Sequence, residues 1–487
     1  MGTHIHKSIQ LVACLSKAEK IEFRAFLDSG LYTTDPRLIK LFQIVSENIH
    51  LHVPWDFRKI FAHIEPNTVF SDQRMRDQLR RLTSLLHQYL AIKAMLRDQE
   101  VLDMMTLEAL ANRSSGEHFT KQYNTVQKRV QTPKRDSLSS LDFRYRTLRL
   151  KRTTEESSRH RIYSQALREE AEAADKVFVL TKLRQYCEIL NRNYMYQQED
   201  QPSLIDDILD LLARHPVLFD HHAIHLWHQA LITLQNPDSK AALDSLLLSL
   251  RDHSSVLEKG ECRSLYKYAL NFCIRRINAG DSEYLPISFE IYQQMLSEGL
   301  LHNQGWLSHT DVKNIVSSGI RIGEVDWVAT FIEEARHQVQ SPWAENVYTY
   351  CKSYLLAETG RKRQAIRLLQ ELTFSDVYYA VSARILLLRT FFELGEFDTL
   401  LYQITAFENF LKRNRSISPR NKKLHLTFAR QLRKITNLKE SEEIYPRKDL
   451  KLKAEGIWKQ ASEKEMSNKS WLLLQIRPGA SGHTRET

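Results

Sequence analysis

Three segments of the C-terminal half decide the fold: Gly323-Glu-Val-Asp-Trp-Val-Ala-Thr-Phe-Ile332, Gly360-Arg-Lys-Arg-Gln-Ala-Ile-Arg-Leu-Leu369 and Gly395-Glu-Phe-Asp-Thr-Leu-Leu-Tyr-Gln-Ile404. Their glycines lie 37 and 35 residues apart, a spacing typical of helix-pair repeats. Apolar residues recur five, nine and twelve positions after each glycine: Val328, Ile332 and Ala335; Ala365, Leu369 and Leu372; Leu400, Ile404 and Phe407. The spacing predicts a helix with one apolar face, and a glycine suits the tight bend before it.

A single repeat cannot bury such a face, so the pattern predicts an array in which each repeat packs against its neighbours. Gly280 shares the phase, with Leu285, Phe289 and Tyr292 at the same offsets, and the wider gap to Gly323 predicts an insertion at 299–307. The chain has only 14 glycines and 12 prolines among 487 residues, which indicates few turns relative to helix. No alternating run is long enough to predict a strand. We therefore predict an all-α fold built around an α-solenoid array.

The sequence divides into four segments. Residues 1–95 are predicted to form a helical domain, because Ser16 and Glu19 form a capping box, Pro36 restarts the chain and a further helix begins near Ser71. Segment 96–140 is basic and has weaker helical signals, with loops predicted at 112–116 and 132–140. The array is predicted to occupy 141–435, with helices at 204–213, 222–234, 241–250, 263–277 and 422–435. Segment 436–487 is charged and irregular, and we expect disorder from Pro478 onward.

Several stretches between residues 15 and 435 carry a family resemblance: Leu15–Leu27, Leu38–Phe42, Arg76–Leu90, Leu183–Arg192, Cys273–Gly280, Val312–Val316, Asp326–Val328 and Phe410–Arg415. They are similar to an uncharacterised family of bacterial all-helical repeat proteins. The C-terminal repeats also loosely resemble tetratricopeptide repeats, from which the residues four before the glycines depart (Gly319, Leu356 and Phe391). The resemblance implies a helical array that makes protein contacts, and it carries no activity, catalytic residue or cofactor.

The sequence indicates a soluble cytoplasmic protein. The residues before Lys20 carry no export signal, since the apolar run Ile9–Leu15 is short and charged residues follow it. No stretch approaches the roughly 18 apolar residues that a membrane span needs. Five cysteines are scattered without a CxxC pair, as expected of reduced thiols: Cys14, Cys187, Cys262, Cys273 and Cys351. Cys187 is expected to be packed in a helix rather than reactive.

A histidine cluster stands in Asp220-His-His-Ala-Ile-His-Leu-Trp-His228. His221, His225 and His228 are four and three positions apart, a spacing that brings imidazoles to one helical face, as a metal site requires. The HExxH pattern of zinc enzymes is excluded because no Glu follows the first histidine of either pair. In the alternative interpretation, Asp220 caps a helix after Pro216, and the histidines are partly exposed or fill the groove. We favour this alternative and predict no metal and no other cofactor.

A basic stretch at 121–161 contains twelve Lys or Arg residues and four acids, a local balance of +8 against +10 for the whole chain. Aromatic residues are interleaved with it, as on nucleic-acid surfaces. The candidate contacts to phosphate or to an acidic partner are Arg144, Arg146, Arg149, Lys151 and Arg152. The alternative is a solvated helix whose buried face comprises Leu141, Tyr145 and Leu148. A second basic run at 412–423 is predicted to link two helices.

Enzyme motifs are absent: the sequence has no GxxxxGK[ST], no GxGxxG after a strand, no GxSxG and no kinase set. Two classes of function remain. In the leading hypothesis the chain is a non-enzymatic scaffold whose repeat surface binds a protein or peptide partner. In the alternative it is a nucleic-acid-binding or regulatory protein that uses the 121–161 stretch. Salt distinguishes the two, because phosphate contacts weaken steeply as salt rises.

Overall fold

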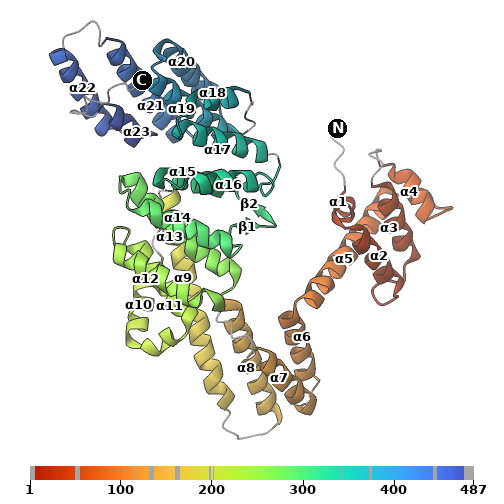
Figure 1. The fold of residues 1–487 in the computed structure, drawn as a ribbon. Coiled ribbons are helices and arrows are strands. Elements are labelled where there is room, and N and C mark those ends of the chain that lie inside the picture. The colour runs from red at the N-terminus through yellow and green to blue at the C-terminus, as the bar shows by residue number, and fades with distance from the viewer. Residues whose placement is uncertain are drawn as a thin grey trace. The chain divides into compact units, whose positions relative to one another are not determined.

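The computed structural model describes residues 6–49, 55–113, 116–130, 137–158, 165–196, 199–200, 202–341, 343–371, 374, 376–441 and 447–476. Over these residues the fold is helical apart from one short hairpin, which confirms the all-α prediction (Figure 1). The chain forms two compact units: unit 1 comprises Met1–Lys134 and Ser139–Val177, and unit 2 comprises Arg135–Leu138 and Phe178–Thr487. The division lies within the segment predicted as one array, inside helix α9 (Gln165–Tyr196).

The helices before α9 are α1 (Lys7–Cys14), α2 (Lys17–Asp28), α3 (Pro36–Asn48), α4 (Phe57–Ile64), α5 (Asp72–Arg97), α6 (Gln99–Ala111), α7 (Gly116–Val130) and α8 (Leu138–Ser158). The predicted capping box is present at the start of α2, where the Ser16 hydroxyl accepts from the Glu19 N–H and the Glu19 carboxylate accepts from the Ser16 N–H. Pro36 is the first residue of α3, and Ser71 caps α5 as the sequence predicts.

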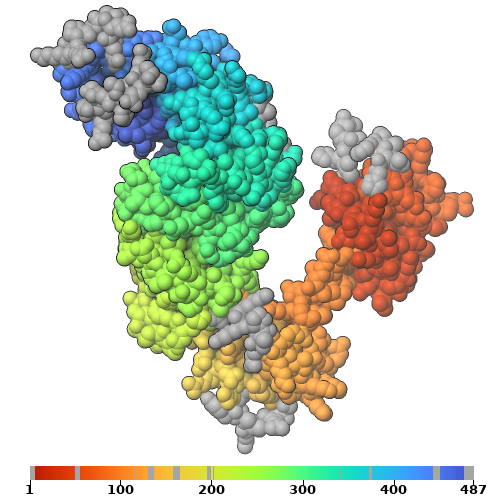
Figure 2. All heavy atoms as spheres, in the orientation of Figure 1, coloured from red at the N-terminus to blue at the C-terminus, as the bar shows by residue number. Residues whose placement is uncertain are grey.

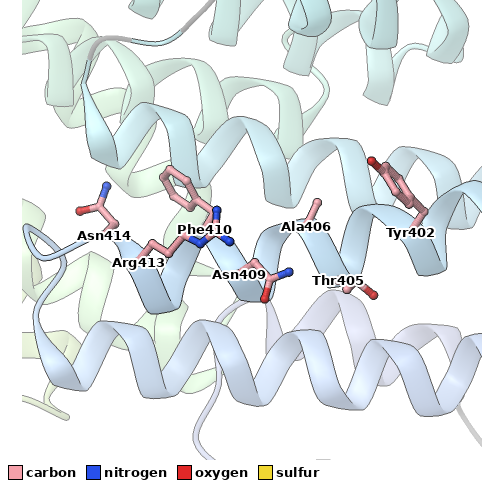
Figure 3. Close-up of a pocket in the computed structure, with 7 residues that line it drawn as sticks. All are labelled: Tyr402, Thr405, Ala406, Asn409, Phe410, Arg413 and Asn414. Atoms are coloured by element: carbon pink, nitrogen blue, oxygen red, sulfur yellow. The ribbon is translucent and has the colours of Figure 1, made fainter.

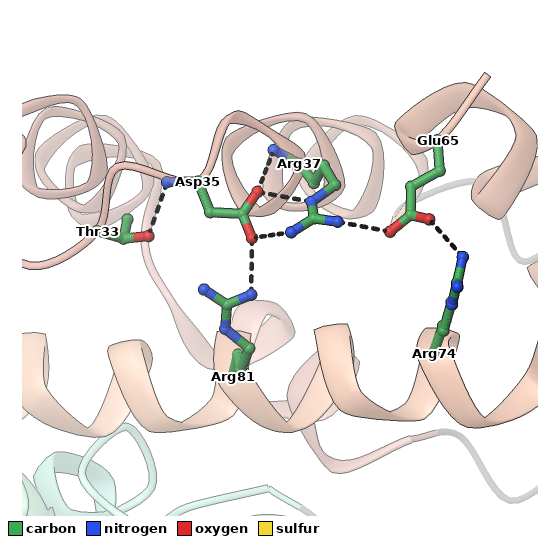
Figure 4. Close-up of polar contacts among 6 residues, drawn as sticks. All are labelled: Thr33, Asp35, Arg37, Glu65, Arg74 and Arg81. Atoms are coloured by element: carbon green, nitrogen blue, oxygen red, sulfur yellow. Dashed lines mark hydrogen bonds and ion pairs between the residues drawn. The ribbon is translucent and has the colours of Figure 1, made fainter. Parts of the chain in front are cut away.

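An ion-pair network joins the N-terminal helices of unit 1 (Figure 4). Asp35 caps α3 and accepts hydrogen bonds from the Arg37 backbone N–H, from Arg37 Nε at 2.8 Å and from Arg81 Nη1 at 2.7 Å. Arg37 also reaches Glu65 at 3.0 Å, and Arg74 lies 3.8 Å from the same carboxylate. The network therefore ties α5 to the chain segments that precede α3 and follow α4, above a core that includes Phe23.

Segment 96–140 contains more helix than the sequence predicts. Gly116, expected in a loop, begins α7, and the part of the second predicted loop that is described, from Leu138, belongs to α8; residues 131–136 lie outside the described residues. The reason is a small apolar core that the sequence does not mark by strong periodicity: Met104, Leu107, Phe119, Tyr123, Val126 and Phe143. The buried face of α8 likewise includes Phe143 and Thr147, whereas the predicted Tyr145 is only partly buried.

The elements after α9 are α10 (Ile205–Arg214), η1 (Pro216–Asp220), α11 (His222–Gln235), α12 (Lys240–His253), η2 (Ser254–Val256), α13 (Lys259–Ala279), α14 (Tyr284–Ser297), β1 (His302–Asn303), β2 (Trp306–Leu307), α15 (His309–Ile322), α16 (Val325–Ala335), α17 (Ala344–Glu358), α18 (Lys362–Glu371), α19 (Val377–Leu394), α20 (Phe397–Arg413), α21 (Pro419–Glu440), α22 (Arg447–Ser462) and α23 (Lys469–Gln475). Each of the five predicted helices of the array is found within a residue of its predicted start or inside a longer helix.

The phased glycines lie at bends beside helices, as the sequence predicts. Gly280, Gly323, Gly360 and Gly395 all have positive φ, between +73° and +112°, and each ends or follows a helix. Residues with a Cβ rarely adopt this conformation. Every described residue at the three offsets is buried, from Leu285, Phe289 and Tyr292 to Leu400, Ile404 and Phe407, while Leu372 lies outside the described residues.

The helices of unit 2 pack mainly against their neighbours in sequence. From α13 to α21 each helix contacts the next, and α15 also contacts α17, which contacts α19. In the space-filling view the colours of this unit follow one another from yellow-green to blue, so segments close in sequence lie close in space (Figure 2). The predicted insertion at 299–307 contains the β1–β2 hairpin. The Arg263 side chain donates hydrogen bonds to the carbonyl oxygens of Leu300 and His302 and so fixes the start of this hairpin.

The prediction of an irregular segment beyond Asn437 is wrong for its described part. Helix α21 continues to Glu440, and α22 and α23 follow it. Ala461, Met466, Leu472 and Ile476 are buried in one core with residues of α19, α20 and α21. In α22 the apolar residues are thinly spread among charged ones, and the apolar run of α23 is too short to show a helical period. The expected disorder from Pro478 lies outside the described residues.

Candidate functional site

The five basic residues singled out by the sequence all lie on α8, but the structure does not gather them into one free surface. Arg152 pairs with Glu156 at 2.8 Å and with Glu170 at 2.6 Å, and Arg146 lies 3.4 Å from Glu108. Lys151 Nζ lies 5.5 Å from the centre of the Tyr123 ring. These three side chains thus help to pack α8 within unit 1.

Arg144 and Arg149 differ from the other three. Both are exposed, and in the described part of the chain neither has a carboxylate within ion-pair distance. The second basic run joins α20 to α21 between Arg413 and Pro419, as predicted. Of the five candidate residues on α8, these two therefore remain without an ion-pair partner among the described residues.

The histidine cluster packs within the fold. His225 Nε2 lies 3.3 Å from Ser249 Oγ, and the His228 ring lies 5.0 Å from the Phe219 ring. Burial lowers the pKa of both imidazoles, which favours their neutral forms. His221, not the predicted Asp220, is the N-cap of α11, because Asp220 ends the preceding 3₁₀ helix. Over the described ranges, no three His, Cys, Asp or Glu side chains are placed to hold a metal ion.

The cysteines in unit 2 are packed rather than reactive. Cys187 is buried, as predicted, with its Sγ 3.6 Å from the Trp227 carbonyl oxygen. Burial raises the pKa of Cys187, and it raises the pKa values of Cys262, Cys273 and Cys351 to about 12. A thiol with such a pKa is not a thiolate near neutral pH, and the thiolate is the nucleophile.

A cavity of about 380 Å³ in unit 2 gathers side chains that the sequence analysis does not single out. One helix of each successive pair contributes to it: α15, α17, α19 and α21, with Asn468 joining from the residues before α23. The lining residues are Lys313, Tyr350, Tyr378, Val381, Ser382, Ile385, Leu386, Arg389, His425 and Asn468. Ligand sites of this size commonly combine apolar walls with a few convergent polar groups, and this lining has both.

Lys313 is the central polar group of the cavity. Its Nζ donates to Ser382 Oγ at 2.7 Å and lies 5.1 Å from the centre of the Tyr350 ring and 5.8 Å from that of Tyr379. Tyr379 is itself fixed, since its hydroxyl donates to the His309 carbonyl at 2.8 Å. Burial lowers the pKa of Lys313. In the described part of the chain, no carboxylate lies within ion-pair distance of this amine.

The two other basic side chains of the cavity are already engaged. Arg389 Nη2 lies 2.7 Å from Glu358 Oε1, and its guanidinium lies 5.2 Å from the centre of the Trp471 ring. His425 Nδ1 lies 3.0 Å from Ser467 Oγ, and burial, together with the charge of Lys313, lowers its pKa. The cavity therefore has one cationic group, Lys313, without a carboxylate at ion-pair distance among the described residues, although Asp376 at the start of α19 acts on it from farther away and partly offsets the lowering of its pKa by burial.

The repeat register is the sequence signal that points to this cavity. Lys313, Tyr350 and Ile385 each stand ten residues before a phased glycine. Equivalent positions of successive repeats face the same side, so these three residues are expected to line one surface. The site is therefore indicated by residues that precede the glycines, whereas the apolar residues after the glycines indicate the helix that packs.

A second, larger groove of about 590 Å³ lies on α20 (Figure 3). The described residues that line it come from this helix and the residue after it: Tyr402, Thr405, Ala406, Asn409, Phe410, Arg413 and Asn414. The guanidinium of Arg384 lies 4.0 Å from the centre of the Phe410 ring, on the α19 side. Because one helix supplies the lining, this groove has fewer converging groups than the Lys313 cavity.

Comparison with known proteins adds no relative from which a function could be transferred. No protein-family model matches the chain, and no curated protein is significantly similar to it. None of the described helices combines the length and the apolar character that a membrane span requires. Function is therefore inferred from the residues and their geometry.

Proposed function

We propose that this chain is a non-enzymatic scaffold, a tetratricopeptide-like α-solenoid, that binds a protein or peptide partner. The supporting observation is the repeated unit: positive-φ glycines at near-regular spacing, buried residues at fixed offsets after them, and helices that contact mainly their sequence neighbours. Arrays of this kind present one helix of each pair on a continuous surface, which suits extended partners.

The Lys313 cavity supports a binding surface on unit 2 within this proposal. It is built by α15, α17, α19 and α21, which are the alternate helices of successive pairs. Tyr378 beside it is 57 % exposed, although an aromatic ring usually gains from burial. An exposed aromatic side chain next to a partly apolar cavity is typical of a surface that a partner covers.

Nucleic-acid binding or regulation through α8 is the second candidate. It is supported by Arg144 and Arg149, which are exposed and have no carboxylate partner among the described residues. The ion pairs of Arg146 and Arg152 argue against a larger role for this helix, because a phosphate would have to compete with carboxylates already in place. A cytoplasmic location belongs to the leading proposal and is supported by the five cysteines, all of them free.

Purification of the tagged full-length chain from native lysate tests the proposal, with and without nuclease and at low and high salt. We expect a protein partner that is retained in all four conditions. A variant with Arg144, Arg146, Arg149, Lys151 and Arg152 replaced by Gln should retain that partner. Recovery of nucleic acid alone, lost at high salt and in the Gln variant, would overturn the scaffold in favour of the second candidate.

A further inference from the structure

The Lys313 cavity has an unusual charge balance. Arg389 is paired with Glu358, and burial favours the neutral form of His425, so Lys313 is the cation of the cavity that has no ion-pair partner among the described residues; Asp376 acts on it only from beyond ion-pair distance. A lysine ammonium has three N–H donors. Ser382 Oγ takes one of them, and the rings of Tyr350 and Tyr379 are attracted to the cation without accepting a conventional hydrogen bond. The ammonium therefore retains donors for a ligand.

The dimensions and walls of the cavity restrict that ligand. A volume of about 380 Å³ accommodates a side chain or chain end but not a folded domain. Val381, Ile385 and Leu386 give it an apolar wall, and Ser382 and Asn468 add small polar groups. A nucleic-acid strand requires a row of cations along its backbone. A cavity with apolar walls and a single cation without an ion-pair partner instead suits an organic group that carries one negative charge.

We propose that the Lys313 cavity binds a carboxylate of an acidic peptide, with Lys313 as its counterion. This inference rests on the proposed function, because the peptide is a segment of the protein partner. The carboxylate comes from an Asp or Glu side chain or from a chain terminus, both of which present the same two acceptor oxygens. Its neighbouring residues lie against Tyr378 and the apolar wall. The charge pair is only partly exposed, so it contributes more than a pair on the open surface.

The test uses random short peptides displayed on phage and selected on the immobilised full-length chain. We expect the recovered peptides to share an acidic residue or an acidic C-terminus. Synthetic copies are then measured by fluorescence anisotropy against the unaltered chain, Lys313→Met, Lys313→Gln and the control Lys423→Met, which removes an exposed lysine of α21. Both Lys313 variants should weaken binding at least tenfold, and Lys423→Met should not change it.

Matched peptides identify the carboxylate. Replacing the acidic residue of the peptide, Asp by Asn or Glu by Gln, should weaken its affinity for the unaltered chain by the same factor as the Lys313 substitutions do. The same replacement should hardly change the affinity for Lys313→Met, because the pair between Lys313 and the carboxylate is already absent there. If only C-terminal amidation has this effect, the carboxylate is a chain terminus. Peptides that bind Lys313→Met and the unaltered chain equally would overturn the proposed carboxylate site and leave the scaffold intact. Recovery of no peptide above background would also overturn the carboxylate site, whereas the scaffold is tested by the purification from native lysate.

Discussion

At the scale of single residues, we expect the buried Lys313 ammonium to lower the stability of the fold and to serve ligand binding. Its ammonium is drawn out of water and lacks a carboxylate partner among the described residues, and such burial is unfavourable. We predict that Lys313→Met raises the free energy of unfolding by about 1 kcal/mol at pH 7, because the apolar chain keeps the packing and removes the charge. Urea denaturation followed by tryptophan fluorescence measures this change.

The pH dependence of that gain follows from the direction of the pKa shift. Burial lowers the pKa of Lys313 below its ordinary value of 10.5, so the unfolded chain holds this proton to higher pH than the folded chain. The cost of the buried charge is therefore complete below the folded-state pKa and declines as pH rises from there toward 10.5. The advantage of Lys313→Met should shrink over the same range. A Lys313→Met chain less stable than the unaltered one at pH 7 would show that the amine is a structural group.

In contrast to Lys313, Asp35 carries a charge that we expect to stabilise the fold of unit 1. Hydrogen bonds from Arg37 are the main cause that lowers the pKa of this carboxyl to about 2, from an ordinary value of 3.8. We predict that Asp35→Asn destabilises unit 1 by about 1–2 kcal/mol at pH 7, allowing for the partly exposed arginines. Asn retains the capping ability, so the change isolates the charge.

The effect of Asp35 should depend on pH in a defined direction. Because the folded-state pKa is lowered, the stabilisation is present above about pH 4 and is lost as pH falls through about 2. Denaturation of Asp35→Asn and the unaltered chain should converge in that range. The control Asp28→Asn removes an exposed pair with Arg24 and should change stability by less than about 0.5 kcal/mol. An equal effect of the two substitutions would contradict this account.

At the scale of elements, the phased glycines determine where one helix ends and the next begins. Gly323 has a φ of +90°, and a Cβ at this position meets no atom within 4 Å. The cost of Gly323→Ala is therefore backbone strain alone, which we expect to be about 1–2 kcal/mol. Gly260→Ala is the matched control: it is equally open, lies in the first turn of α13 and has no positive φ, so it should be neutral or stabilising. Thermal unfolding of the two variants checks the difference in sign.

Gly319 controls the packing of neighbouring helices rather than a turn. A Cβ here would lie 2.5 Å from Val328 Cγ2 and 2.8 Å from the Phe289 ring, so α15 approaches α14 and α16 closely. We predict that Gly319→Ala costs about 1–3 kcal/mol through overpacking. Adding Val328→Ala should recover part of this loss in a double-mutant cycle, because it removes the closest clash. Strictly additive effects would show that the two side chains do not compete for the same space.

The sequence predicts elements better than it predicts the site, and the reasons are physical. Periodic apolar positions and capping residues such as Ser16 and Pro36 act locally, so helix ends follow from a few neighbouring residues. Helices α7 and α22 have sparser apolar residues whose burial depends on distant partners. The Lys313 cavity requires four helices to meet, and its lysine and tyrosine resemble ordinary surface residues until the register relative to the glycines is compared.

At the scale of the molecule, the distribution of net charge along the sequence does not show which cations have ion-pair partners. The concentration of positive charge at 121–161 suggested a phosphate-binding surface, but Arg146 and Arg152 are used in ion pairs within unit 1. In the proposed site in unit 2, one lysine without an ion-pair partner among the described residues lies in a partly apolar cavity. Binding at such a site should persist at high salt, since partly buried pairs are screened less than exposed ones.

Photo-crosslinking in living cells tests the scaffold proposal most directly. Benzoylphenylalanine is placed at Tyr378, beside the Lys313 cavity, or at Glu334, an exposed position on α16 outside it. We predict a protein adduct from position 378 that survives nuclease, is absent from position 334 and is strongly reduced in the Lys313→Met background. Adducts of equal yield at both positions, or adducts from position 378 that nuclease removes, would contradict a protein partner at this surface.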